Sequence, residues 1–581
     1  MRCRGSIRPL QQVLHVALKT PPSERTITTR QPVAVGAVVA HFASLVVGFA
    51  ALVYLGRHQW FFADEWAALL KRGLGLSGED GLLQPHNEHW IAGPILIYRM
   101  IYNLIGVKSY IPYLACDLAL HVALAHVLWQ IMRKLRVDAW VSTALSTMFV
   151  FLGAGAENIL WAFQVGFIGS FLLGFIALYL VMDGTVAESG DRGFGSGTER
   201  AQQTEVVSPP KRAASSLSVA RIAWASGLCV ASLAFSSNVI PVIVVVAAVA
   251  WYRQDLRAAG GVALAPAAVF AGWMLLYGRG GLGAHEITAG SLVALPAFVA
   301  LGLARSLQAI IRIPGLVVSL AALAGIWLWW RERTTQIALI IAGGAVLFFA
   351  LTGIGRVAEF GVGFAKSERY VYLGVALLLP LAGVLLTMLI RDSFRRQALV
   401  LVLLAYALVS NALLLRARAG EELVRETQIR EEVLAAAQLQ ASGEVLLADS
   451  PDILESPDVS WSGVAALRAD GALPDDQPRA KALDRARLRY QAVFGATAGF
   501  ESGLEGCLVS DAGAPLRVTG PASYTLDAPP DVTIEAALDP SGPWVALDRN
   551  NARPVLDVAI EEPDVLLDSE DGSPFEVCGA G

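Results

Sequence analysis

Residues 33 to 66 read VAVGAVVAHFASLVVGFAALVYLGRHQWFFADEW, and they decide the fold class of this chain of 581 residues. Residues 33 to 55 contain no Asp, Glu, Lys or Arg, and about 20 apolar residues are enough to cross a bilayer as a helix. Asp64 and Glu65 follow this run, among four aromatic residues, Trp60, Phe61, Phe62 and Trp66. Because aromatic side chains gather at the membrane interface, we expect both carboxylates at the edge of the hydrocarbon.

The composition of the whole chain agrees with a membrane protein. Hydrophobic residues make up 55% and charged residues 16%, whereas about a quarter of the residues in a soluble domain are charged. The mean hydropathy is +0.53. The charge is uneven, because residues after 415 hold 13 Lys and Arg against 30 Asp and Glu, which leaves residues 1–415 with a net charge of +12. We therefore predict an all-α polytopic membrane domain followed by an acidic domain in water.

Eleven apolar runs are predicted to be transmembrane helices. They lie at about 33–55, 109–131, 138–154, 162–182, 221–236, 239–252, 262–277, 313–330, 335–354, 370–390 and 398–415. With this count, the basic turns at 133–136, 253–257, 331–333 and 391–396 all fall on the side of the basic N-terminal arm, residues 1–32. The positive-inside rule makes that side cytoplasmic. The chain is thus predicted to be a multi-pass protein of the cell membrane with an extracytoplasmic C-terminal domain.

Two long segments interrupt the predicted spans. Residues 56–108 form an outer loop, in which WIAGPILIYRMIYNLIG (90–106) is typical of an amphipathic helix at the interface. Residues 184–220, rich in Gly, Ser, Glu and Arg, are predicted to be a disordered cytoplasmic linker. The linker separates a front module, residues 33–183, from the C-terminal transmembrane helices, residues 221–415.

The tail, residues 416–581, begins with a charged helical pattern and continues as short segments with strand-like alternation. We expect a small extracytoplasmic domain of α+β or β-sandwich type. Its two cysteines, Cys507 and Cys578, could form a disulfide outside the cytoplasm or remain unpaired.

Several motifs resemble the GT-C superfamily of membrane glycosyltransferases. They are the acidic pair near the start of the first outer loop, the polar sequence HNEHW (86–90) before PILIYRMIYNLIG (94–106), and Ser367-Glu368-Arg369-Tyr370 at the start of a late span. The resemblance implies an inverting transferase in contact with membrane lipid. Its donor would be a sugar on a polyprenyl phosphate and its acceptor a cell-envelope glycan or lipid, with no nucleic-acid partner.

Asp64 is the candidate general base. Glycosyl transfer from a lipid phosphate requires a group that accepts the proton of the acceptor hydroxyl, and a positioned carboxylate can do this. Glu65 would support Asp64 or bind a sugar hydroxyl. The alternative is that Asp64 only caps a helix over residues 65–72.

His86, Glu88 and His89 fall in one polar turn. Together with Asp64, the side chains of Glu88 and His89 could bind Mg²⁺, Mn²⁺ or Zn²⁺ and so neutralise the donor phosphate. The same turn could instead bind the substrate directly by hydrogen bonds, or form a solvated loop. The spacing does not distinguish these three possibilities.

Two later turns on the same predicted side supply the other candidate residues for substrate binding. The first contains Glu157, Asn158, Trp161 and Gln164, and the second contains Lys366, Arg369 and Tyr370. An acid, an amide and an indole suit a sugar, and fixed cations stabilise the charge that develops on a leaving phosphate. We expect Arg369 to hold this phosphate and nearby Arg356 to matter less. The alternatives are a helix cap with an interface Trp, and cations that reach lipid headgroups.

The sequence leaves three kinds of function open. A GT-C-like transferase is favoured because the polar groups gather at one face. A flippase or exporter for lipid-linked sugar or polysaccharide would more typically show internal repeats and broken helices at mid-membrane. A scaffold acting through the tail would not need Asp64.

Overall fold

The computed structural model describes residues 35–76, 80–182, 218–279 and 288–494, and in the tail residues 500–501, 504–510, 515–529, 532–547 and 555–579. The predicted arm, residues 1–32, and nearly all of the predicted linker, residues 184–220, lie outside these ranges.

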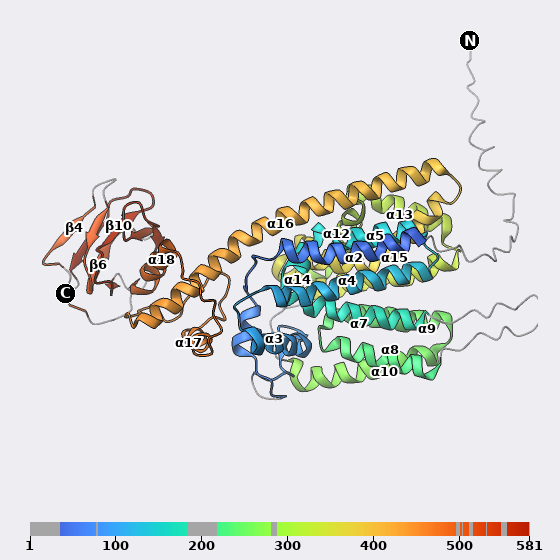
Figure 1. The fold of residues 1–581 in the computed structure, drawn as a ribbon, viewed down its shortest axis with the longest axis horizontal. Helices are drawn as coiled ribbons and strands as arrows, with labels where there is room; N and C mark the ends of the chain where they lie inside the picture. Colours follow the sequence, from blue (N-terminus) through green and yellow to red (C-terminus); the bar gives the residue numbers. More distant parts are fainter. Residues whose placement is uncertain are drawn as a thin grey trace, which may run out of the picture.

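Long apolar helices form a bundle that makes up most of the molecule (Figure 1). They are α2 (Val35–Leu55), α4 (Ile111–Lys134), α5 (Ala139–Val150), α7 (Val165–Val181), α8 (Val219–Leu233), α9 (Ile240–Arg253), α10 (Leu256–Trp273), α12 (Ala289–Ile311), α13 (Gly315–Trp329), α14 (Arg333–Phe360), α15 (Glu368–Ile390) and α16 (Phe394–Ser442). Within the described residues, eight helices are long and apolar enough to cross a membrane, or nine if the bent pair Ala139–Val150 and Gly153–Leu160 is one span. The chain is therefore a multi-pass membrane protein, and the number of eleven crossings stays a prediction.

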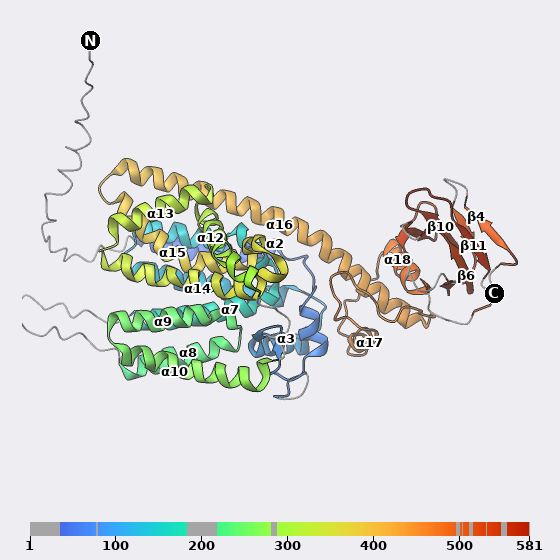
Figure 2. The ribbon, with the colours of Figure 1, turned by 180° about the vertical axis from the view of Figure 1, so that it is seen from behind.

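Each predicted span overlaps a helix, but the prediction missed α12. α12 packs on α14, since a Cβ at Gly302 would lie 2.4 Å from the Phe349 ring. It ends beside α16, where the Asn411 side chain donates to the carbonyl of Ala309. α12 lies nearer the β-strands, and α13 lies toward the opposite end of the bundle (Figure 2). The two helices therefore follow one another along the bundle.

The loop of residues 56–91 and helix α3 (Ala92–Ile105) lie at the end of the bundle that faces the β-strands, which we call the site end (Figures 1 and 2). The loop contains the short helix η1 (Ala67–Lys71) and a hairpin of β1 (Pro85–His86) and β2 (His89–Trp90). α3 exposes a stripe of apolar side chains at intervals of four residues, namely Leu96, Met100 and Leu104. Since its other side is buried, this stripe supports the predicted position at the interface.

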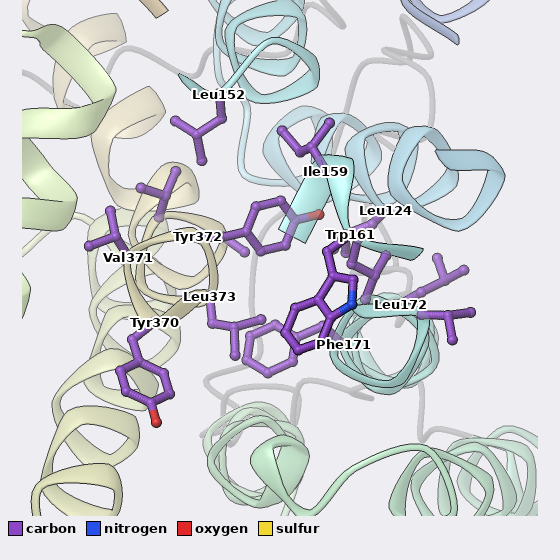
Figure 3. Close-up of a cluster of buried hydrophobic side chains, with 14 of the residues drawn as sticks. Leu124, Leu152, Ile159, Trp161, Phe171, Leu172, Tyr370, Val371, Tyr372 and Leu373 are labelled. Carbon is purple, nitrogen blue, oxygen red and sulfur yellow. The ribbon is translucent and has the colours of Figure 1, made fainter. Parts of the chain in front are cut away.

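A buried apolar cluster lies next to the site end (Figure 3). It joins the first turns of α15 to α7 and to the short helix α6 (Ala156–Leu160). Tyr372 is fully buried here, and its hydroxyl lies 2.7 Å from Nδ1 of His121 on α4. Close packing of this kind fixes the start of α15, and with it the positions of Arg369 and Tyr370.

The tail begins as a continuation of the last membrane helix. α16 runs without interruption for 49 residues, so the predicted span at 398–415 and the charged helix predicted after it are one element. Helices α17 (Trp461–Ala469) and α18 (Ala480–Gln491) follow.

Two antiparallel sheets with a shared apolar core complete the tail. One has the order β3 (Ala492–Phe494), β9 (Val555–Val558), β6 (Ala522–Asp527), β11 (Glu576–Gly579), β4 (Cys507–Val509), and the other β5 (Leu516–Val518), β10 (Val565–Ser569), β7 (Ile534–Ala537), β8 (Val545–Ala546). Cys507 and Cys578 face each other across β4 and β11 and form a disulfide. Of the two folds predicted for this region, these sheets match the β-sandwich.

Candidate functional site

The backbone before Asp64 is held by the tail. The amide of Trp60 donates to the Glu426 carboxylate on α16 at 2.9 Å, and the amide of Ala63 donates to the carbonyl of Glu455 at 3.0 Å. Ala63 has a φ of +49°, in the left-handed region that is uncommon outside glycine. No side chain makes a capping hydrogen bond at the start of η1. The alternative that Asp64 serves only as a helix cap is therefore not supported.

Asp64 lines a cleft with an empty volume of about 540 Å³, which includes space open to solvent. We call it the Asp64 cleft. Its polar lining is Asp64, His86, Asn87, His89, Gln164, Arg356, Arg369 and Tyr370, and its other walls are Ile91, Pro94, Trp161, Phe163, Gly166, Phe167 and Phe235. Candidate residues from turns that are far apart in the sequence thus meet in one cavity with aromatic walls.

Asp64 is placed so that it stays ionised. Burial by itself raises the pKa of Asp64, but the neighbouring His86, with smaller contributions from Arg369 and His89, outweighs this, so the pKa lies below its ordinary value. Nε2 of His86 is 3.5 Å from a carboxylate oxygen of Asp64. A carboxylate in this state can accept a proton at neutral pH.

His89 is held in one orientation by Ser237. Nδ1 of His89 is hydrogen bonded to the Ser237 hydroxyl, which also donates to the carbonyl of Glu88 at 3.2 Å. Because the hydroxyl has one proton, Nδ1 must be the donor to Ser237, which leaves Nε2 as an acceptor. Burial lowers the pKa of His89 to about 4, and the charges of Arg356 and Arg369 add to this effect. The ring is therefore neutral at physiological pH.

Two arginines from different helices reach the cleft, and each is oriented by a glutamate. Nη2 of Arg356, near the end of α14, lies 2.8 Å from Glu88, and Nη2 of Arg369, at the start of α15, lies 2.6 Å from Glu157. The amide of Arg369 also donates to Glu157 at 3.3 Å. A guanidinium has five N–H donors, so each arginine can bind a ligand while paired. Glu88 and Glu157, which were predicted to bind substrate, pair with these arginines and are not among the lining residues of the cleft.

Glu65 lies outside the cleft, although it is the neighbour of Asp64. Its carboxylate is fully buried and accepts hydrogen bonds from Tyr98 at 2.5 Å, Tyr110 at 3.0 Å and the amide of Phe62 at 3.0 Å. Burial raises the pKa of Glu65 to about 8, against the opposing effect of these hydrogen bonds. Glu65 therefore ties the loop to α3 and α4 and does not face a ligand in the cleft.

The remaining predicted residues divide between the cleft and its surroundings. Trp161 stacks on Phe62 with ring centroids 4.9 Å apart, and together with Gln164 it lines the cleft. Asn158 is fully buried behind the cleft, where its amide nitrogen lies 3.4 Å from the side-chain oxygen of Gln164. Lys366 is exposed and does not line the cleft.

The donor atoms predicted to bind a metal are not brought together. Asp64, Glu88 and His89 do not form a group with ligand atoms within 4.8 Å of one another, and Glu88 is engaged by Arg356. Within the part of the chain that the structure describes, the one cluster that meets this distance contains Cys507 and Cys578, whose sulfurs are already joined. The cleft therefore does not fit the predicted three-ligand site.

The sequence analysis missed two features of the site. Arg356 was ranked low because nothing near it in the sequence indicates that it meets Glu88, which is 268 residues away. The second feature is the contact between α16 and the Asp64 loop. Arg418 pairs with Glu368, the neighbour of Arg369, at 2.9 Å, and the guanidinium of Arg425 lies 4.3 Å from the Phe62 ring centroid. In the sequence, the high density of charged residues on α16 was the only feature that indicated this contact.

Comparison of the chain with protein-family models, with curated proteins and with solved structures finds no match.

Proposed function

We propose that this protein is an integral-membrane glycosyltransferase of the GT-C type, which transfers a sugar from a polyprenyl phosphate to a glycan or lipid acceptor on the exoplasmic face. One observation carries the proposal. Asp64, held ionised, shares a cleft with Arg356 and Arg369 at one end of an apolar bundle. A base beside fixed cations at a membrane edge is the minimum that transfer from a lipid phosphate requires.

The reaction needs one displacement at the anomeric carbon of the donor sugar. The acceptor hydroxyl oxygen attacks this carbon while its proton passes to a carboxylate oxygen of Asp64. The bond from the anomeric carbon to the phosphate oxygen breaks, and the phosphate leaves as an anion on its lipid. Attack from the face opposite the phosphate inverts the configuration of the sugar.

The cations and the aromatic walls bind different parts of the donor. Arg356 and Arg369 place N–H donors from two helices on the leaving phosphate, where charge develops during the reaction. Phe163, Phe167 and Phe235 offer an apolar surface for the first part of the lipid chain. His89, neutral and oriented by Ser237, can accept a hydrogen bond from a sugar hydroxyl through Nε2.

The test is sugar transfer by the purified protein in detergent, from synthetic short-chain polyprenyl phosphates that carry a hexose or a pentose. Detergent micelles do not separate two compartments, so a transporter without transferase activity gives no product. Formation of a glycoside with inverted configuration supports the proposal. If no donor is used while vesicles containing the protein move lipid-linked sugar across the bilayer, the protein is a transporter and the assignment of Asp64 as a base fails.

A further inference from the structure

A second cleft lies between the membrane domain and the tail, and the reaction at Asp64 does not use it. Its empty volume is about 840 Å³, which includes space open to solvent. It is lined by the end of η1, by one side of α3 and by the segment from Asp458 to Asp470, which contains α17. We call it the tail cleft.

The charges in the tail cleft come close to balance, with one more aspartate than cations. Nζ of Lys71 lies 2.5 Å from Asp458, and the hydroxyl of Tyr102 donates to Asp470 at 3.0 Å. Arg99 is the second cation, and its Nε donates to the carbonyl of Arg72 at 2.8 Å. The two cations face three aspartates across the whole lining, so a phosphate or another anion would gain little here.

The chemistry of the lining favours a neutral ligand with many hydroxyl groups. Eight of the twelve lining residues are charged or carry a hydroxyl, which leaves too little apolar surface for a lipid chain. Ser460 and Ser462 are exposed at the rim, and hydroxyls and carboxylates can donate to or accept from sugar hydroxyls. Tyr102 adds an aromatic ring on which the apolar face of a sugar can pack. The cavity volume that can be compared with other sites is about 400 Å³, within the usual range of about 300–1,000 Å³ for small-ligand sites.

The linings of the tail cleft and the Asp64 cleft lie close together in the sequence but share no residue. Lys71 lines the tail cleft and is seven residues after Asp64, a distance of about 10 Å along a helix. A second connection runs through Arg72, whose side chain donates to the carbonyl of Pro85 at 3.0 Å. Pro85 precedes His86, the residue in contact with Asp64.

We propose that the tail cleft binds a neutral oligosaccharide, and that this oligosaccharide is the acceptor chain whose end reaches Asp64. The acceptor role rests on the proposed function, whereas carbohydrate binding does not. The tail segment thereby selects a glycan acceptor over a simple lipid.

Two neighbouring alanines on α17 provide a matched pair of variants. Ala466 lines the cleft, whereas Ala465 is also exposed but does not line it. Ala466→Trp is expected to fill the cleft and to weaken binding of fluorescent neutral hexose and pentose oligosaccharides by about tenfold or more. Ala465→Trp is expected to bind like the wild type, and both variants should keep the thermal midpoint of the wild type in detergent.

Transfer assays then separate the two proposals. With an oligosaccharide acceptor, Ala466→Trp should raise KM about tenfold and leave kcat nearly unchanged, while transfer to a monosaccharide acceptor should not change. Equal oligosaccharide binding by Ala466→Trp and wild type would overturn the tail cleft proposal, as would competition by inorganic phosphate. If the wild type binds oligosaccharide and Ala466→Trp does not, but no sugar is transferred, the cleft stands as a carbohydrate site and the transferase proposal fails.

Discussion

The Asp64 cleft and the tail cleft lie at the two ends of the segment from Asp64 to Lys71, yet they differ in what surrounds them. The Asp64 cleft has aromatic walls and two arginines fixed by glutamates, so it can hold a charged phosphate against an apolar chain. The tail cleft is open, and the ion pair of Lys71 with Asp458 joins two of its own lining residues. Under the two proposals above, reaction chemistry and recognition of the acceptor are separated, and the loop after α2 lies between them.

The largest effect is expected from removal of the base. Asp64→Asn should lower kcat by about 10²–10⁴, the usual contribution of general acid–base catalysis, while binding of oligosaccharide in the tail cleft should not change. Asp539→Asn, an exposed carboxylate in the β-sandwich, is the control with the same change in charge. A variant of Asp64 that turns over at nearly the wild-type rate would show that the chemistry is elsewhere.

The second largest effect is expected from the two arginines of the Asp64 cleft. Arg369→Ala should lower transfer by about 10²–10³, in the range measured when one donor to a developing anion is removed. Arg369→Lys and Arg356→Lys should each lose less, since a point charge copies a planar guanidinium only in part. Lys366→Ala is the control, because Lys366 is a nearby cation outside the cleft. Equal losses for Lys366→Ala and Arg369→Ala would mean that general charge matters and the cleft does not.

Glu65, whose carboxylate joins the loop to α3 and α4, should affect stability more than catalysis. Its pKa is about 8 in the folded protein and about 4.3 in an unfolded chain. Between these values the unfolded chain releases a proton that the folded protein keeps, so stability falls as pH rises from about 4.3 to about 8. Glu65→Gln lacks this titration, and its thermal midpoint in detergent should fall less between about pH 5 and pH 8 than that of the wild type. Parallel curves for the two proteins would contradict a protonated Glu65.

The smallest effect is expected from metal removal. The cleft places cationic guanidinium groups where the phosphate would leave, and Glu88 is engaged by Arg356, so dialysis against EDTA should change the transfer rate by less than about twofold. Restoration of lost activity by Mg²⁺, Mn²⁺ or Zn²⁺ would instead favour a metal ion held by Asp64 and His89.

The sequence predicted the membrane helices well because apolar length is a strong local signal. α12 was missed although its mean hydropathy, 1.6, equals that of α4, which was predicted; packing on α14 and α15 stabilises it. The uninterrupted length of α16 was also missed. The change in composition at residue 416 suggests a domain boundary in the sequence. The helical hydrogen bonds of α16 continue through this point, because ion pairs within the helix and to residues after it stabilise its charged half.

Seven of the predicted site residues line the Asp64 cleft, namely Asp64, His86, His89, Trp161, Gln164, Arg369 and Tyr370. The sequence could identify these residues because few polar and aromatic residues lie next to the predicted membrane spans. The roles of Glu65, Glu88 and Glu157 could not be predicted, since each depends on a partner brought close by folding. Whether a carboxylate faces a ligand or an arginine is decided by helix packing, which a single sequence does not contain.

The length of α16 sets the distance between the helix bundle and the β-sandwich. The 27 residues of this helix after residue 415 extend about 40 Å, and the helix is anchored at the site end through Arg418 and Glu426. We infer that this continuous helix holds the β-sandwich at a fixed distance from the site end. For the proposed transferase, which takes its donor from the bilayer, deletion of turns from the end of α16 would move the β-sandwich toward the Asp64 cleft.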